Sequence, residues 1–162
     1  MTTLSVLKFP AADGAQQMES TVLNLQKQHL IEVQDAAIVT WPQGKKQPKT
    51  EQLHSMASAG ALQGAFWGML FGLIFFVPFF GLAIGAAMGA LSGKFADYGI
   101  DDNFIKQTRE KVTEGTSALF LLTSGAVVDK VVEATKGQTF EILSTNLPKD
   151  KEDELRAAFG AE

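Results

Sequence analysis

The sequence predicts an α+β sandwich that is interrupted by an apolar helical hairpin. Two observations lead to this prediction. Residues before position 44 and after position 98 alternate between the two-residue period of strands and the 3.6-residue period of helices. Between them, residues 52–93 contain no Lys, Arg, Asp or Glu, although the 162-residue chain carries 14 basic and 18 acidic side chains. This length and this segregation of charge fit one globular domain with an insertion.

The first part of the domain, residues 1–43, is predicted to form a strand, a helix and a strand. An extended apolar run ends at Phe9, and Asp13 is then in position to cap an amphipathic helix over residues 15–29. In the second strand, apolar residues alternate at Ile31, Val33, Ala37 and Val39. Residues 44–54, which include three lysines, are expected to form a basic linker.

The second part, residues 99–147, repeats this alternation and is followed by a terminal helix. The predicted elements are a helix over 103–112 capped by Asp101 or Asp102, a fully buried strand over 117–123, a helix from Val127 to Gly137, a strand over 139–145 and an acidic helix within 148–162. The order βαβ, insertion, αβαβ predicts a ferredoxin-like sandwich, in which helices cover one face of a four-stranded sheet.

Two ladders of glycines spaced by four residues mark the insertion, residues 55–98, as a glycine-zipper helical hairpin. The ladders are Gly60, Gly64, Gly68 and Gly72, then Gly81, Gly85, Gly89 and Gly93. Residues four apart share one helix face, and a face without side chains lets another helix approach closely. Each glycine in a helix interior costs about 1 kcal/mol relative to alanine, so the ladders indicate a packing role in oligomerisation. Pro78 is the expected turn of the hairpin.

The hydropathy of the hairpin predicts insertion into a lipid bilayer. Six of the twelve phenylalanines fall between positions 66 and 80, on what would be the outer surface of the arms. A first arm over 57–77 would be about 31 Å long, enough to span a transmembrane distance of about 30 Å. The second arm reaches that length only if it continues through Lys94 to Tyr98. The apolar turn at Pro78 equally fits a soluble assembly that buries its hairpins in a shared core.

The sequence offers no constellation of residues for catalysis. There is no cysteine, and the net charge of -4 argues against nucleic acid as a partner. Capping of a helix explains Asp101 and Asp102 without a metal, while His29 and His54 lack a metal-ligand pattern. We therefore expect no enzyme activity, cofactor, metal or small-molecule substrate. Gln63, the strongly polar side chain expected deep in the first arm, is a candidate for a hydrogen bond between subunits.

Two motifs carry a family resemblance. Residues 97–106, Asp-Tyr-Gly-Ile-Asp-Asp-Asn-Phe-Ile-Lys, and 115–120, Gly-Thr-Ser-Ala-Leu-Phe, follow the glycine-rich segment. Together they resemble the bacterial family of predicted membrane proteins catalogued as domain of unknown function 1269. The resemblance spans nearly the whole chain and is most specific over 60–120; Asn103 departs from a position where an acidic residue is common. It implies a bacterial membrane protein and supplies no catalytic residue.

These observations combine into one expected function and two alternatives. We expect a non-enzymatic, self-associating protein of the bacterial inner membrane, in which the glycine ladders build a homo-oligomer that is structural or pore-forming. Lysines on both sides of the hairpin, and the lack of a signal-peptide pattern, predict that both termini are cytoplasmic. The first alternative is a cytoplasmic soluble ring or filament with the hairpins as its core. The second, by fold analogy alone, is a ligand-binding regulatory module.

Overall fold

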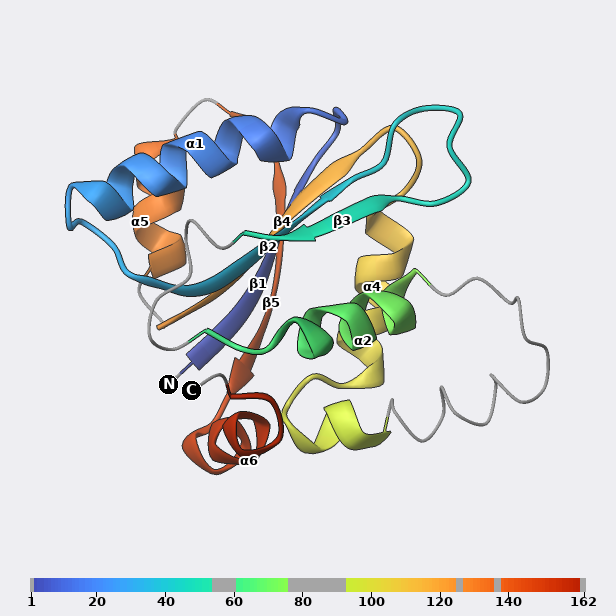
Figure 1. Cartoon of the computed structure of the whole chain (residues 1–162). Helices are drawn as coiled ribbons and strands as arrows, with labels where there is room; N and C mark the ends of the chain where they lie inside the picture. Colours follow the sequence, from blue (N-terminus) through green and yellow to red (C-terminus); the bar gives the residue numbers. More distant parts are fainter. Residues whose placement is uncertain (1, 54–60, 76–92, 125–126, 136–137, 161–162) are drawn as a thin grey trace.

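A five-stranded antiparallel sheet forms the centre of the fold (Figure 1). The computed structural model describes residues 2–53, 61–75, 93–124, 127–135 and 138–160. The strands are β1 (Thr2–Phe9), β2 (Val33–Thr40), β3 (Lys49–Gln52), β4 (Ser117–Ser124) and β5 (Glu141–Leu147). Their order across the sheet is β3-β2-β4-β1-β5. The basic linker expected over 44–54 therefore contains an edge strand, β3.

Helices lie on both faces of this sheet. On one face are α1 (Gly14–Lys27) and α5 (Val127–Ala134); on the other are α2 (Gly64–Ile74), α4 (Asp102–Lys111) and α6 (Lys149–Phe159) (Figure 1). Residues 93–97 are also helical. The prediction of a four-stranded sheet covered on one face is thus wrong. The physical reason is that the strands β1, β2 and β4 are buried along both sides, so both sides must be covered.

Strand β4 shows how the two cores arise from one sequence run. Ala118, Phe120 and Leu122 enter the core beneath α2, whereas Leu119 and Leu121 enter the core beneath α1. All five are at most 1% exposed. The prediction of a strand buried on both faces is confirmed, because an unbroken apolar run alternates its side chains between two cores.

The elements around β4 agree closely with the sequence prediction. The Asp101 carboxyl group accepts a hydrogen bond from the Phe104 amide at 2.9 Å, which confirms the predicted cap of α4. Helix α6 begins after Pro148 and ends at Phe159, as expected. Asp13 stands at the N-cap of α1, but its side chain makes no capping hydrogen bond. Strand β5 begins at Glu141, two residues later than predicted.

Helix α2 differs from the predicted first arm of the hairpin. This helix has 11 residues, and all of its bulky side chains except that of Met69 pack into the core beneath the sheet. The expectation that these side chains face lipid is therefore wrong for α2. Tyr98, the residue that the second arm would have to reach in order to span a bilayer, is 5% exposed and packs against Phe95 and Phe159. Within the described part of the chain, no helix combines the length and apolarity needed to cross a membrane. Residues 54–60 and 76–92 lie outside it.

Glu152 ties α6 to the start of β1. Its carboxylate accepts hydrogen bonds from the Thr2 hydroxyl at 2.6 Å and from Nε of Arg156 at 3.3 Å. Burial alone would raise the pKa of Glu152, but these two hydrogen bonds and the Arg156 charge outweigh it and lower the pKa from 4.5. The ionised form of Glu152 is therefore stabilised in the folded chain.

We predict that this contribution to stability is lost in acid. Because the folded-state pKa of Glu152 lies below its unfolded value, the stabilisation is complete above about pH 4.5 and disappears as the pH falls through the folded-state pKa. Glu152→Gln should lower the melting temperature at neutral pH and change it little in strong acid. Glu154→Gln, at an exposed position of the same helix, is the control. Equal losses at both pH values would contradict the assignment.

Candidate functional site

Helix α2 has two unlike faces. Met69 is 41% exposed, and the other bulky residues are buried: Phe66, Trp67, Leu70, Phe71, Leu73 and Ile74. Its small residues are exposed, and we call the surface formed by Gly64, Gly68 and Gly72 the glycine face. The alternation follows from spacing, because residues four apart share one side of a helix. One face of α2 is thus buried in the core, and the other face is exposed.

Aromatic contacts fix the buried face of α2 against the sheet and α6. The rings of Trp67 and Phe71 meet the ring of Phe120 on β4 edge-on, with centroids 6.3 and 5.1 Å apart. Phe66 packs against Phe95 at 5.6 Å and against Phe159 of α6 at 5.7 Å. Aromatic pairs of this kind add about 0.5 to 1.5 kcal/mol each beyond the area they bury. The orientation of α2 about its axis is therefore well determined.

A buried carboxyl group, that of Asp35 on β2, holds the start of α2. Asp35 is 0% exposed. Its Oδ2 accepts hydrogen bonds from the Leu62 amide and from the indole Nε1 of Trp67, both at 2.9 Å. Nε2 of Gln52 on β3 donates to the same oxygen at 3.0 Å, and the Ala36 amide donates to Oδ1 at 2.8 Å. Four donors from three segments thus satisfy a group that would be costly to bury alone.

A β-bulge turns Asp35 toward α2. The register of β2 against β4 shifts between Val33 and Asp35. Val33 therefore enters the core beneath α1, while Ala37 and Val39 enter the core beneath α2, where Asp35 also makes its contacts. Unbroken alternation would put Val33, Ala37 and Val39 on one face of the strand, and the bulge separates Val33 from the other two because it adds a residue.

Arg109 of α4 holds the other end of α2. Its guanidinium donates to the carbonyl oxygens of Ile74 at 2.8 Å and Leu73 at 2.5 Å. The last carbonyls of a helix lack partners within the helix, and a positive charge there also interacts favourably with the helix dipole. An acidic residue at the start and a basic residue at the end therefore both favour α2 in its observed place.

The glycine face itself is open. Among the residues that the structure describes, a Cβ atom added at Gly68 or Gly72 would have no neighbour within 4 Å, and one added at Gly64 would meet Oε1 of Gln52 at 3.4 Å. Gly93 is similarly open. The other ladder residues and the turn residue fall outside the described residues: Gly60, Gly81, Gly85, Gly89 and Pro78. The contacts described so far therefore do not require glycine at positions 64, 68 and 72.

Gln63 precedes α2 instead of lying deep within an arm. It is the N-cap residue of α2, its amide donates to the Phe159 carbonyl at 2.7 Å, and its side-chain amide donates to the Gly160 carbonyl at 3.2 Å. The predicted depth of Gln63 is wrong because α2 begins later than the expected arm. A contact from Gln63 to another subunit stays a prediction.

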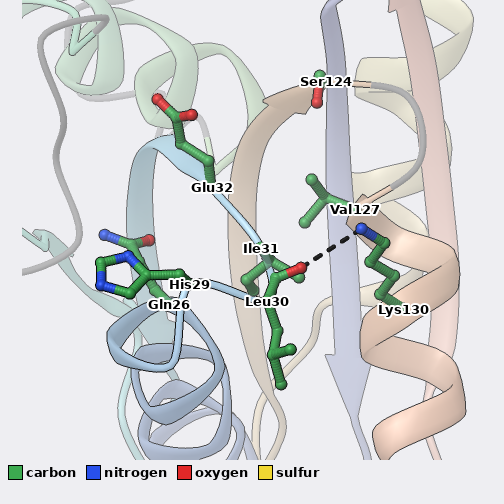
Figure 2. A pocket seen from close by; sticks show the side chains of 8 residues that line it. All are labelled: Gln26, His29, Leu30, Ile31, Glu32, Ser124, Val127 and Lys130. Carbon is green, nitrogen blue, oxygen red and sulfur yellow. Dashed lines mark hydrogen bonds between the residues drawn. The ribbon is translucent and has the colours of Figure 1, made fainter.

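A hollow of about 580 Å³ opens between the end of α1 and α5 (Figure 2). Gln26 and His29 line one side and Lys130 lines the other; Nζ of Lys130 donates to the Leu30 carbonyl at 3.4 Å. Glu32 and Lys130 are both exposed, so water screens their charges. The described residues contain no cluster of three His, Cys, Asp or Glu side chains that could hold a metal. His54 lies outside them.

Sequence reasoning missed Asp35 and Arg109, the two residues that position α2. One signal was available for Asp35, because it is an acidic residue inside an apolar strand, and such residues are seldom buried without partners. No such signal exists for Arg109, since a basic residue near the end of an amphipathic helix is ordinary. Its partner carbonyls belong to another helix, 35 residues earlier in the chain.

We predict that Asp35→Asn destabilises the fold by about 2 to 4 kcal/mol. Asparagine offers one acceptor oxygen where Asp35 offers two, so its amide hydrogens would oppose either the Ala36 donor or the donors of Leu62 and Trp67. The measurement is a denaturant titration of the full chain. Asp129→Asn, at an exposed carboxyl group of α5, should cost well under about 1 kcal/mol. Similar losses for both variants would show that the Asp35 contacts do not hold α2.

We also predict that the glycine face costs the isolated chain stability. Gly68→Ala should stabilise the dilute chain by about 1 kcal/mol, because alanine is the better helix former and its Cβ enters open space. Gly99→Ala should instead destabilise it by about 1 kcal/mol or more, since Gly99 has φ +96 and its Cβ would meet the Asn146 carbonyl at 3.2 Å. Chemical denaturation of both variants tests this; a loss at Gly68 would reveal a contact within the chain.

Comparison with known proteins gives one match. The family described as Protein of unknown function (DUF1269) matches residues 61–160, more than half of the chain, from just before α2 to the residue after α6. No curated protein and no solved structure matches. The matched residues include the glycine face and Arg109, whereas Asp35 precedes them. The chain belongs to the DUF1269 family.

Proposed function

We propose that the chain is a non-enzymatic protein that self-associates into a homo-oligomer, and that the glycine face of α2 is part of the contact between copies. One observation carries this proposal: three glycines share one face of α2 at a spacing of four, and no side chain or backbone of the described residues lies closer than 3.4 Å to where their Cβ atoms would be. Gly68 stands in the helix interior, where glycine costs about 1 kcal/mol relative to alanine. No contact among the described residues offsets this cost, whereas close packing of a second helix against the glycine face would offset it.

The second ladder is the matching surface in this proposal. Gly81, Gly85, Gly89 and Gly93 repeat the spacing of the first ladder, so a helix that carries them could approach α2 closely. Contacts along such a seam come from van der Waals packing and Cα–H···O interactions, which depend on short distance. A single added side chain on the glycine face would separate the backbones and remove many of them together.

The sandwich is proposed to be ferredoxin-like with an added edge strand. Four of its strands lie in the order β2-β4-β1-β5, and the connections β1-α1-β2 and β4-α5-β5 both place their helix on the same face. This arrangement of split βαβ units supports the proposal. In it, β3 extends the sheet beyond β2, and α2, α4 and α6 cover the face that an open sandwich of this type would leave free.

Attachment to the bacterial inner membrane, with both termini cytoplasmic, is the second part of the proposal. The uncharged stretch over residues 52–93 supports it. Because the bulky face of α2 is buried in the domain, α2 contributes little surface to lipid, and any span would have to be supplied outside α2. That same burial favours the alternative of a soluble homo-oligomer with the glycine ladders in its shared core.

Fractionation separates these two versions. Cells expressing the full chain are lysed, the membranes are washed in carbonate, and the supernatant is sized by light scattering. Retention in the washed membrane supports an integral anchor. A large particle in the supernatant supports the soluble assembly and removes the membrane from the proposal. A monomer in either fraction contradicts self-association.

The predicted effect of Gly68→Leu is loss of assembly without loss of folding. A Cβ atom at position 68 meets no described residue within 4 Å and leucine is the better helix former, so the melting temperature of the dilute chain should not fall. Chemical cross-linking and sedimentation should nevertheless show smaller species than the wild type. Ala157→Leu, at an exposed position of α6, adds similar apolar area elsewhere and is the matched control. Unchanged assembly in Gly68→Leu, or equal loss in both variants, would exclude the glycine face.

A further inference from the structure

The turn between β2 and β3 lies beside the end of α2, where an uncharged stretch of the sequence begins (Figure 1). The ring of Trp41, the residue after β2, meets the ring of Phe75 edge-on, with centroids 5.9 Å apart. Phe75 is the C-cap residue of α2, and residues 76–92, which follow it, contain no Lys, Arg, Asp or Glu. Because Phe75 is bonded to the first of these residues, an environment that takes up the stretch also reaches the turn.

Hydrogen bonds give this turn a defined shape. Indole Nε1 of Trp41 donates to the Lys45 carbonyl at 2.9 Å. Nε2 of Gln43 and the Gly44 amide donate to one carboxylate oxygen of Glu114, at 2.8 and 3.1 Å. Gly44 has φ +88, a left-handed conformation that glycine adopts without strain. Lys45 takes part in these contacts through its backbone, so its side chain is not needed to hold the turn.

Two lysines of this turn carry charges that the fold does not use. Lys45 and Lys46 are exposed, and among the described residues neither ammonium group has an ion pair or a hydrogen bond. The carboxylate that contacts the turn, that of Glu114, offsets one of the two charges. At the other end of the uncharged stretch, Lys94 is likewise exposed. The turn therefore presents positive charge to whatever lies beside the start of this stretch.

We propose that Trp41, Lys45 and Lys46, which we call the turn surface, bind the headgroups of anionic phospholipids at the face of a bilayer. This inference rests on the membrane version of the proposed function. A lysine close to an anionic leaflet strengthens binding about fivefold. An indole ring is favoured at the level of the headgroups, between water and the acyl chains. The turn surface combines both kinds of side chain next to a stretch without charge.

Lipid fits the turn surface better than a second copy or a nucleic acid does. In a twofold contact, the turn surface would bring the lysines of one copy against those of the other, which is repulsive. A nucleic acid would meet a chain with a net charge of -4, and two lysines are few for a phosphate backbone. A bilayer offers phosphates to the lysines and an apolar interior to the adjoining stretch.

The test measures how closely Trp41 approaches lipid headgroups. The full chain is mixed with vesicles of phosphatidylcholine, alone or with phosphatidylglycerol, that carry a quencher of tryptophan fluorescence on their headgroups. Of the two tryptophans, Trp67 is 2% exposed, so quenching reports on Trp41. We expect stronger quenching when phosphatidylglycerol is present, and a decrease as salt is added. Equal quenching with both kinds of vesicle, or none, would overturn the proposal.

The outcomes separate this inference from the membrane attachment on which it rests. A chain that stays with both kinds of vesicle after a carbonate wash, with equal quenching, overturns the role of the turn surface alone. A chain that binds neither kind of vesicle contradicts both. A shift of Trp41 emission that rises with protein concentration in the absence of lipid would assign the turn surface to contact between copies, and would also overturn the inference.

A pair of double variants tests the lysines directly. Lys45→Gln with Lys46→Gln should weaken binding to the phosphatidylglycerol vesicles about tenfold or more without lowering the melting temperature. Lys27→Gln with Lys149→Gln removes the same charge at the end of α1 and the start of α6, away from the turn (Figure 1), and is the matched control. Equal losses in the two double variants, or unchanged binding in the first, would overturn the proposal.

Discussion

The Asp35 carboxyl group is the constraint on which the arrangement beneath the sheet depends. It is fully buried, and it accepts hydrogen bonds from β2, β3, the residue that leads into α2 and α2 itself. A polar group in that position stabilises a fold only when its acceptor capacity is filled, so the donors of Gln52, Leu62 and Trp67 must all arrive together. The β-bulge of β2 turns the Asp35 side chain toward α2, and the aromatic side chains of α2 cover the sheet around it.

The sequence predicted correctly those elements that depend on interactions between residues close together in the chain. The apolar run of β4 and the capping of α4 by Asp101 could be read directly, because periodicity and a short-range hydrogen bond determine them. The role of Asp35 could not, because its donors come from positions up to 32 residues away. Hydropathy also cannot distinguish a helix that faces lipid from one that faces a protein core, and α2 is an example: Phe66 and Trp67 cover a sheet.

The sequence predicted which residues form the glycine face, but not the contacts that hold the helix on which they lie. The spacing of Gly64, Gly68 and Gly72 identified a smooth helix face, and that face is indeed exposed. What the spacing could not show is that the rest of the helix is held by Asp35 at one end and Arg109 at the other. A surface meant for close contact between backbones benefits from such rigidity, because a helix that is already ordered loses little entropy on association.

The position of β1 has a consequence for how the chain folds. Strand β1 lies between β4 and β5, so Thr2 pairs with Ser124 and Leu147, across nearly the full length of the chain. Contacts this distant in sequence require closure of long loops and slow the search for the native state. During synthesis, β1 cannot pair with β4 until more than a hundred further residues have left the ribosome. Until then the apolar side chains of Leu4 and Val6 cannot enter the core that they share with β4.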